Sequence, residues 1–134
     1  METVLKNFTF EFFGKGKHKT SAAAFFQMEE AVLLDVRSNE EAASLPIGLG
    51  HHSNIETLAI PINEIPERLP EIPKDKPIGV FCPSNVRSAI VYTFLFTKGF
   101  KDVRIIDGGY AALTQECMPG KILQAVQAAD YLKE

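Results

Sequence analysis

The chain has little of several features that define whole classes of protein. It contains two cysteines, Cys82 and Cys117, and no tryptophan among its 134 residues. Two cysteines cannot build a disulfide framework, and they cannot alone supply the four ligands of a structural zinc site. Lysine and arginine (14) are outnumbered by aspartate and glutamate (17), which gives a net charge of −3. This charge argues against nucleic acid as the main partner.

Long hydrophobic runs are also missing. No window reaches the ~18 consecutive apolar residues of a membrane-spanning helix. Residues 1–7 lack the uninterrupted apolar centre of a secretory signal. We therefore expect no membrane partner and a cytoplasmic location, although a chain from which a signal had been removed would look the same.

What is present is the composition of one globular domain. The apolar fraction is 46% and the charged fraction is 23%, both ordinary values. A chain of this length buries roughly 65–70% of the surface that it exposes when unfolded, which suffices for a core. We expect an N-terminal extension over 1–19 that contains an edge strand, a domain over 20–118, and a C-terminal helix over 119–134 that packs on the domain or extends it.

Strand-like and helix-like segments alternate along the chain. Such alternation predicts an α/β fold with a mostly parallel central sheet and helices on both faces. Aromatic residues alternate over 8–13 and predict the edge strand. Ser21 and the capping box Ser38-x-x-Glu41 predict the starts of two short helices, the first of which runs to Glu30. Further strands are expected at 31–36, 58–60, 77–81 and 103–106, and further helices at 63–69, 88–98, 110–115 and after 120.

The segment 82–88 carries the chemistry and consists of Cys82, Pro83, Ser84, Asn85, Val86, Arg87 and Ser88. It joins a strand to an apolar helix, so the cysteine lies at the carboxyl edge of the sheet, where α/β proteins form their functional crevice. The turn must curl around the sulfur, and its N–H groups and the helix dipole would favour a thiolate and an anion beside it. Asn85 suits this curl because asparagine tolerates left-handed backbone angles. The plainer alternative is a buried structural cysteine that precedes a helix-capping serine.

Other chemistry-bearing residues have plainer interpretations. His51 and His52 are adjacent and lack both helical i, i+4 spacing and a third nearby ligand, so we expect no metal site. Cys117 could act as a resolving thiol only if the fold brought it to Cys82, and we expect a semi-buried bystander. The basic run 14–19 is expected to be a solvated turn.

Taken together and in order, four segments resemble the rhodanese-like sulfurtransferases over roughly residues 20–118. The resemblance implies a small α/β domain whose Cys82 takes up a sulfane sulfur as a persulfide and passes it to a nucleophile. The amides of the loop from Pro83 to Ser88 would cradle the outer sulfur, and Arg87 would brace the loop against Asp35. The segments are 33–37 (LLDVR), 50–51 (GH) followed by 59–62 (AIPI), 82–88 (CPSNVRS), and 98–100 (KGF) leading to 107–109 (DGG).

The implied mechanism is nucleophilic catalysis by a cysteine thiolate. Cys82 would attack a sulfane sulfur, the rest of the donor would leave, and an acceptor would then remove the outer sulfur. Expected donors are polysulfide or a persulfide, expected acceptors are thiols, including a cysteine of a partner protein, and neither metal nor organic cofactor is required. Thiosulfate is disfavoured because Pro83 offers neither a charge nor an N–H group to this dianion.

Departures from the family pattern keep two rival functions open. Asn85 stands where the family often has glycine, Pro83 stands where it often has a basic residue, and 51–59 is longer than usual, which predicts an insertion beside the crevice. The first rival is a non-catalytic module that binds a partner or senses redox state. The second is a cysteine-loop phosphatase or arsenate reductase, although related folds of this kind place five residues between cysteine and arginine where this chain has four.

Overall fold

The computed structural model describes residues 2–47 and 53–117, apart from the side chains of Thr114, Glu116 and Cys117. The pair His51-His52 and the helix predicted after residue 120 lie outside the described residues. Within the described ranges, no helix has the length and apolar character that would be needed to cross a membrane.

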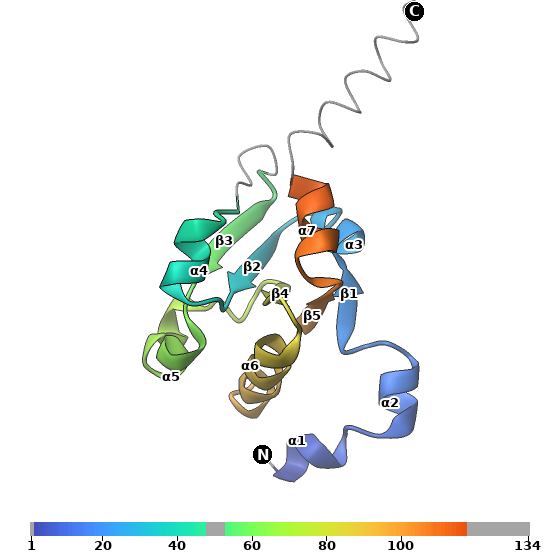
Figure 1. The fold of residues 1–134 in the computed structure, drawn as a ribbon. Coiled ribbons are helices and arrows are strands. Elements are labelled where there is room, and N and C mark those ends of the chain that lie inside the picture. The colour runs from blue at the N-terminus through green and yellow to red at the C-terminus, as the bar shows by residue number, and fades with distance from the viewer. Residues whose placement is uncertain (1, 48–52, 118–134) are drawn as a thin grey trace, which may run out of the picture.

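A five-stranded parallel sheet forms the centre of the domain (Figure 1). Its strand order is β1-β5-β4-β2-β3, and each neighbouring pair runs parallel. The predicted α/β class with a parallel sheet is therefore confirmed. The strands are β1 (Lys19–Ser21), β2 (Ala31–Asp35), β3 (Ile55–Ala59), β4 (Ile78–Phe81) and β5 (Val103–Asp107). The helices are α1 (Glu2–Lys6), α2 (Phe10–Gly14), α3 (Ala22–Phe26), α4 (Asn39–Ser44), α5 (Ile65–Arg68), α6 (Val86–Thr97) and α7 (Gly109–Cys117), with short 3-10 helices η1 (Ile62–Glu64) and η2 (Leu69–Glu71).

Two apolar layers cover the two faces of the sheet. Successive side chains of a strand point to opposite faces, so β2 contributes Val32 and Leu34 to one layer and Leu33 to the other. The first layer contains the buried residues of α6, and the second contains those of α3 and α7. All five residues of β2 are buried, as expected for a central strand with both faces covered. Figure 1 shows α6 on one side of the sheet and α3 with α7 on the other.

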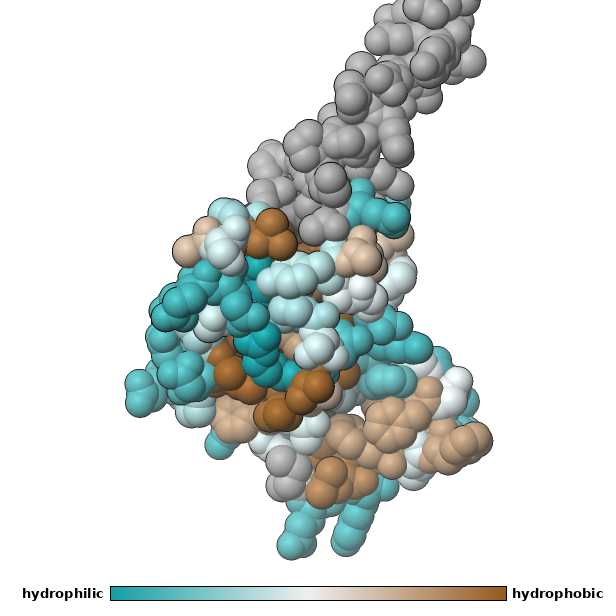
Figure 2. Space-filling view, viewed as in Figure 1, coloured by the Kyte–Doolittle hydropathy of each residue, from teal (hydrophilic) through white to brown (hydrophobic). Residues whose placement is uncertain are grey.

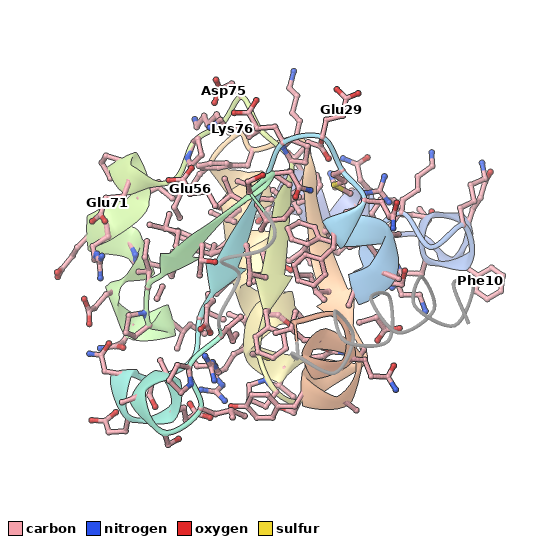
Figure 3. The ribbon with its side chains drawn as sticks, turned by 90° about the horizontal axis from the view of Figure 1, so that it is seen from above. Phe10, Glu29, Glu56, Glu71, Asp75 and Lys76 are labelled. Carbon is pink, nitrogen blue, oxygen red and sulfur yellow. The ribbon has the colours of Figure 1, made fainter. Side chains whose placement is uncertain are left out.

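Charged residues gather at the amino edge of the sheet, away from Cys82. Lys76 precedes β4, and its Nζ lies 3.0 Å from Glu30 Oε1 and 3.8 Å from Glu56 Oε2. Figure 3 shows Lys76 and Glu56 together at this edge. These ion pairs occupy the edge opposite the predicted functional crevice.

The edge strand predicted over 8–13 is wrong, because Phe10–Gly14 form helix α2 and residues 8 and 9 precede it. The side chain of Thr9 caps this helix by accepting a hydrogen bond from the Phe12 N–H (3.1 Å). The rings of Phe8, which precedes the helix, and Phe12 stack at 5.4 Å, and Phe8 also contacts Tyr92 of α6. Phe10 points away from the domain and is 94% exposed (Figure 3). The edge of the sheet is instead formed by β1, which pairs with β5.

Local capping signals locate helix starts better than helix ends. Ser21 caps α3, and the capping box between Ser38 and Glu41 is present in α4, as predicted. However, α3 ends at Phe26 rather than at Glu30. The side chain of Asn54 donates hydrogen bonds to the carbonyl groups of Phe26 (3.0 Å) and Met28 (2.6 Å), which satisfies acceptors at this helix end. A distant side chain thus closes a helix that local propensity would have continued.

Strand β4 has no room for a side chain at Gly79. A Cβ atom there would lie 2.6 Å from Phe25 Cε1 and 2.8 Å from Ile106 Cδ1. We expect Gly79→Ala to lower the free energy of unfolding, measured by urea denaturation, by about 1–3 kcal/mol, the usual cost of overpacking a core. The control is Gly14→Ala, because no atom lies within 4 Å of the added Cβ. If both substitutions changed stability equally, the packing of Phe25 against β4 would be incorrect.

Candidate active site

Cys82 follows the last residue of β4 and is fully buried. The backbone N–H of Ser88 donates a hydrogen bond to Cys82 Sγ (3.2 Å), and the thiol donates to Ser88 Oγ (3.4 Å). Ser88 is also fully buried, in the first turn of α6. The chain from 83 to 87 therefore curls around the sulfur and returns to it with a hydrogen-bond donor.

Asn85 makes the sharp turn of this loop. Its φ of 65° and ψ of −1° are left-handed, which matches the prediction for this residue. Its side-chain Nδ2 donates to Asp107 Oδ1 at the end of β5 (3.1 Å). The chain therefore turns at Asn85 from Cys82 into α6, and the side chain of Asp107 from the neighbouring strand contacts Asn85.

The turn after β5 approaches the cysteine loop very closely at Gly109. Its φ is 58°, and a Cβ atom there would lie 2.4 Å from the carbonyl oxygen of Pro83. Any side chain would therefore collide with the loop backbone, in addition to straining the left-handed conformation. The sequence signal for this contact is a pair of glycines directly after a strand, which marks a turn or a close backbone approach.

Arg87 is bound by Glu41, and the predicted contact of Arg87 with Asp35 is wrong. The guanidinium forms a two-point ion pair with the carboxylate, in which Nη2 lies 3.0 Å from Oε2. Glu41 belongs to α4 and also accepts a hydrogen bond from the Ser38 N–H (3.0 Å). Arg87 therefore ties the first turn of α6 to α4, and its charge is engaged within the protein.

Asp35 pairs instead with Arg37, and both residues are buried. The guanidinium Nε and Nη2 donate to the two carboxylate oxygens at 2.8–3.0 Å. Its Nη1 donates to the carbonyl of Leu45 (2.8 Å) and to the hydroxyl of Tyr110 (3.2 Å). Burial alone would lower the pKa of Arg37, but the hydrogen bonds with Asp35 and Tyr110 raise it overall, so the group stays charged. The sequence interpretation missed this arginine, although Asp-x-Arg directly after a buried strand was its visible signal.

An apolar surface adjoins the loop. Val86 and Ile90, one helical turn apart on α6, are 63% and 56% exposed. Beside them lies an apolar groove of about 150 Å³, and Figure 2 shows hydrophobic side chains over this part of the molecule. The groove is lined by Ile62, Ile65, Pro66, Ile90, Val91 and Phe94.

The structure places Asn85 in the turn after Cys82, and Arg87 and Ser88 in the first turn of α6. The roles in sulfur binding predicted for these residues stay predictions. The structure does not test the other thiol, because the side chain of Cys117 lies outside the described residues. Within the described part of the chain, no group of three or more histidine, cysteine, aspartate or glutamate side chains is arranged to hold a metal ion.

Comparison with known proteins identifies the family. Residues 19–116 match the family model of the Rhodanese-like domain. A protein named Sulfurtransferase from Allochromatium vinosum is 31% identical over 91 residues, which cover 68% of this chain and 78% of that protein. The Putative sulfurtransferase YtwF of Bacillus subtilis is 36% identical over 91 residues, which cover 68% and 81%. The chain belongs to the rhodanese-like family, as its motifs predicted.

Solved structures show the same fold. A rhodanese-related protein from Thermoplasma volcanium superimposes with a TM-score of 0.62 at 27% identity, covering 76% of this chain and 95% of that one. An NAD-dependent persulfide reductase from A. fulgidus superimposes with a TM-score of 0.57 at 35% identity, covering 75% of this chain but only 17% of that one. The homologues named sulfurtransferase support sulfur transfer as the general chemistry of this domain.

The ion pair between Glu41 and Arg87 should give stability a specific pH dependence. The hydrogen bonds from Arg87, and then from the Ser38 backbone, lower the pKa of Glu41 from 4.5 to about 2. A carboxylate whose pKa is lowered by folding stabilises the fold above its unfolded pKa and loses that contribution as the pH falls through the folded pKa. We expect the wild type to be more stable than Glu41→Gln at neutral pH, with the difference shrinking between pH 4.5 and about 2.

Urea denaturation of both proteins across this pH range measures the difference. Arg87→Gln should lose the larger part of this pH-dependent component, because it removes the other half of the pair and leaves the Ser38 hydrogen bond to Glu41 in place. An advantage of the wild type that remained undiminished at pH 2 would contradict the assignment of this ion pair.

Proposed function

We propose that this protein is a sulfurtransferase that carries sulfane sulfur as a persulfide on Cys82 and passes it to a thiol or another nucleophile. The observation that carries the proposal is the loop closed on Cys82, in which the Ser88 N–H lies 3.2 Å from the sulfur. A hydrogen bond from a fixed backbone donor stabilises a thiolate and costs no rearrangement during the reaction. A reducing compartment such as the cytoplasm, where thiols stay reduced, fits this chemistry.

Two transfers of one sulfur atom make up the proposed reaction. In the first, the Cys82 thiolate attacks the sulfane sulfur of the donor, the donor's S–S bond breaks, and its electron pair leaves with the remainder of the donor. In the second, an acceptor thiolate attacks the outer sulfur of the Cys82 persulfide, and Cys82 leaves as a thiolate. Each step exchanges one S–S bond for another, so no external oxidant or reductant is required.

The loop residues have different roles in this proposal. The amides of the segment from Pro83 to Ser88, other than the proline nitrogen, would cradle the outer sulfur. Arg87 would hold the loop through Glu41 rather than touch the substrate, since its guanidinium is already engaged. Asp35 would support the site through Arg37, which contacts the end of α4 and Tyr110 of α7.

Sulfur transfer is favoured over phosphoryl transfer by the same contacts. A phosphoryl group carries several anionic oxygens and needs cationic or N–H donors arranged around all of them. Here the loop closes tightly on the sulfur, and the one arginine of the loop is paired with Glu41. A non-catalytic binding or redox-sensing role remains the alternative function, and the first experiment below separates it from sulfur transfer.

Treatment with polysulfide should add one sulfur atom, about 32 Da, at Cys82. Intact-mass analysis with peptide mapping measures the addition, and a subsequent thiol should remove it. Cys82→Ser should abolish the addition, whereas Cys117→Ser should leave it nearly intact. A protein that gains no sulfur at Cys82, or that needs Cys117 equally, would not be the single-cysteine sulfurtransferase that we propose.

The choice of donor should depend on Pro83. The loop offers thiosulfate no free charge, so the wild type should use this dianion poorly and use polysulfide or a persulfide better. A charge-assisted hydrogen bond contributes ~1.5–3 kcal/mol, roughly 10- to 150-fold in affinity. Pro83→Arg should therefore lower the KM for thiosulfate much more than the KM for polysulfide in steady-state kinetics.

Pro83→Ala is the matched control, because it restores the N–H group without adding charge. It should reproduce only a small part of the arginine effect. The explanation would fail if the wild type already had a KM for thiosulfate in the low micromolar range, or if the alanine variant gained as much as the arginine variant.

A further inference from the structure

Asp107, the last residue of β5, reaches the cysteine loop from the neighbouring strand. Its Oδ1 accepts hydrogen bonds from Asn85 Nδ2 (3.1 Å) and from the backbone N–H of Gly108 (3.0 Å). Its Oδ2 lies 3.6 Å from Lys19 Nζ on the edge strand β1. One carboxylate therefore connects the loop to both the turn that follows β5 and the edge of the sheet.

Asn85 depends on this contact more than a glycine would. The left-handed conformation costs energy for any residue with a Cβ atom, and it persists only where the surroundings hold it. Asn85 Oδ1 is buried and has no hydrogen-bond partner, so Nδ2 makes the one side-chain hydrogen bond found for Asn85 among the described residues. Turning the amide over would place its oxygen against the Asp107 carboxylate, which is repulsive. Asp107 therefore fixes the orientation of the Asn85 side chain.

The path of the backbone from Cys82 to the Ser88 N–H depends on the conformation of Asn85. If φ of this residue moved to the right-handed or extended region, the peptide planes on either side would rotate, and the loop would no longer carry the Ser88 N–H to Cys82 Sγ. Donors that are held in place before the reaction stabilise a developing anion far better than donors that must reorient. The hydrogen bond from Asn85 to Asp107 therefore also helps to fix the loop around Cys82.

We propose that Asp107 is a positioning residue, which acts through Asn85 to keep the loop closed, so that the Ser88 N–H stays directed at Cys82 Sγ. The proposal rests on the proposed function for the chemistry that this donor serves. Asp107 itself touches neither the sulfur nor the substrate. The residue at position 85 should consequently decide whether Asp107 matters at all: with asparagine it is required, and with glycine, which adopts the left-handed turn freely, it is not.

A double-mutant cycle tests this dependence. Asp107→Ala and Asp107→Asn are made in the wild type and in Asn85→Gly. Two rate constants are measured for Cys82 by peptide mapping: alkylation by iodoacetamide and persulfide formation with polysulfide.

In the wild type, Asp107→Ala should slow both reactions by about fivefold or more, an ordinary coupling between contacting residues. Asp107→Asn should stay within about twofold, because its amide oxygen still accepts both hydrogen bonds. In Asn85→Gly, Asp107→Ala should change the rates by less than about twofold.

Asp102→Ala is the matched control, since Asp102 is exposed and immediately precedes the opposite end of β5. It should alter neither rate constant. Equal losses from Asp107→Ala in both backgrounds would overturn the proposal, as would an Asp107→Asn variant that is as slow as Asp107→Ala. If Asp107→Ala fails to fold, as judged by circular dichroism, Asp107→Ser replaces it in both backgrounds. The serine hydroxyl can still accept a hydrogen bond from the Gly108 N–H, but the serine side chain is too short to reach Asn85.

The two readouts separate this proposal from the proposed function. A wild type that gains no sulfur at Cys82 would refute the sulfurtransferase. The alkylation rates would still test the positioning role in that case, because they require only the Cys82 thiolate. Conversely, the wild type could gain sulfur normally while the effects of the substitutions at Asp107 and Asn85 on the rates are additive. That result would refute only the positioning role.

Discussion

The buried ion pair between Asp35 and Arg37 fixes the arrangement on which the rest of the site depends. Arg37 uses the remainder of its guanidinium to bind the end of α4 and Tyr110 of α7, and its Cζ lies 5.9 Å from the ring centre of Phe81, the last residue before Cys82 in β4. Removing one partner of a buried pair leaves an uncompensated charge and typically costs ~3–5 kcal/mol. The contacts that join the end of β2 to α4 and α7 therefore depend on this one pair of charges.

Charges around Cys82 are paired with one another, and this determines what the loop can offer a substrate. Arg87 is bound by Glu41, and Lys19 lies 3.6 Å from Asp107. The donor that the structure places on the sulfur is the backbone N–H of Ser88. Such a loop suits one anionic sulfur atom better than a multiply charged oxyanion. Under the proposed function, the exposed apolar side chains of Val86 and Ile90 beside the loop would favour donors of low charge.

Features with a local cause could be predicted from the sequence. The buried strand β2, the capping box of Ser38 with Glu41 and the left-handed Asn85 each depend on a few consecutive residues, and the structure contains all three. Features set by distant residues could not. Glu41 lies 46 positions from Arg87, and no local pattern distinguishes it from Asp35 as the partner. The aromatic alternation over 8–13 has the period of a strand, and the helix found there is supported by the Thr9 cap and by the packing of Phe8 on Tyr92.

A crystal structure of the protein after polysulfide treatment would reveal whether the closed loop holds a sulfur atom on Cys82. It should show one additional sulfur bonded to Cys82 Sγ within hydrogen-bond distance of two or more loop N–H groups. Asn85 should retain its positive φ, and Arg87 should remain on Glu41. A loop that has opened, or an Arg87 that has left Glu41 to bind the sulfur, would show that the closed loop does not hold the sulfur in this way.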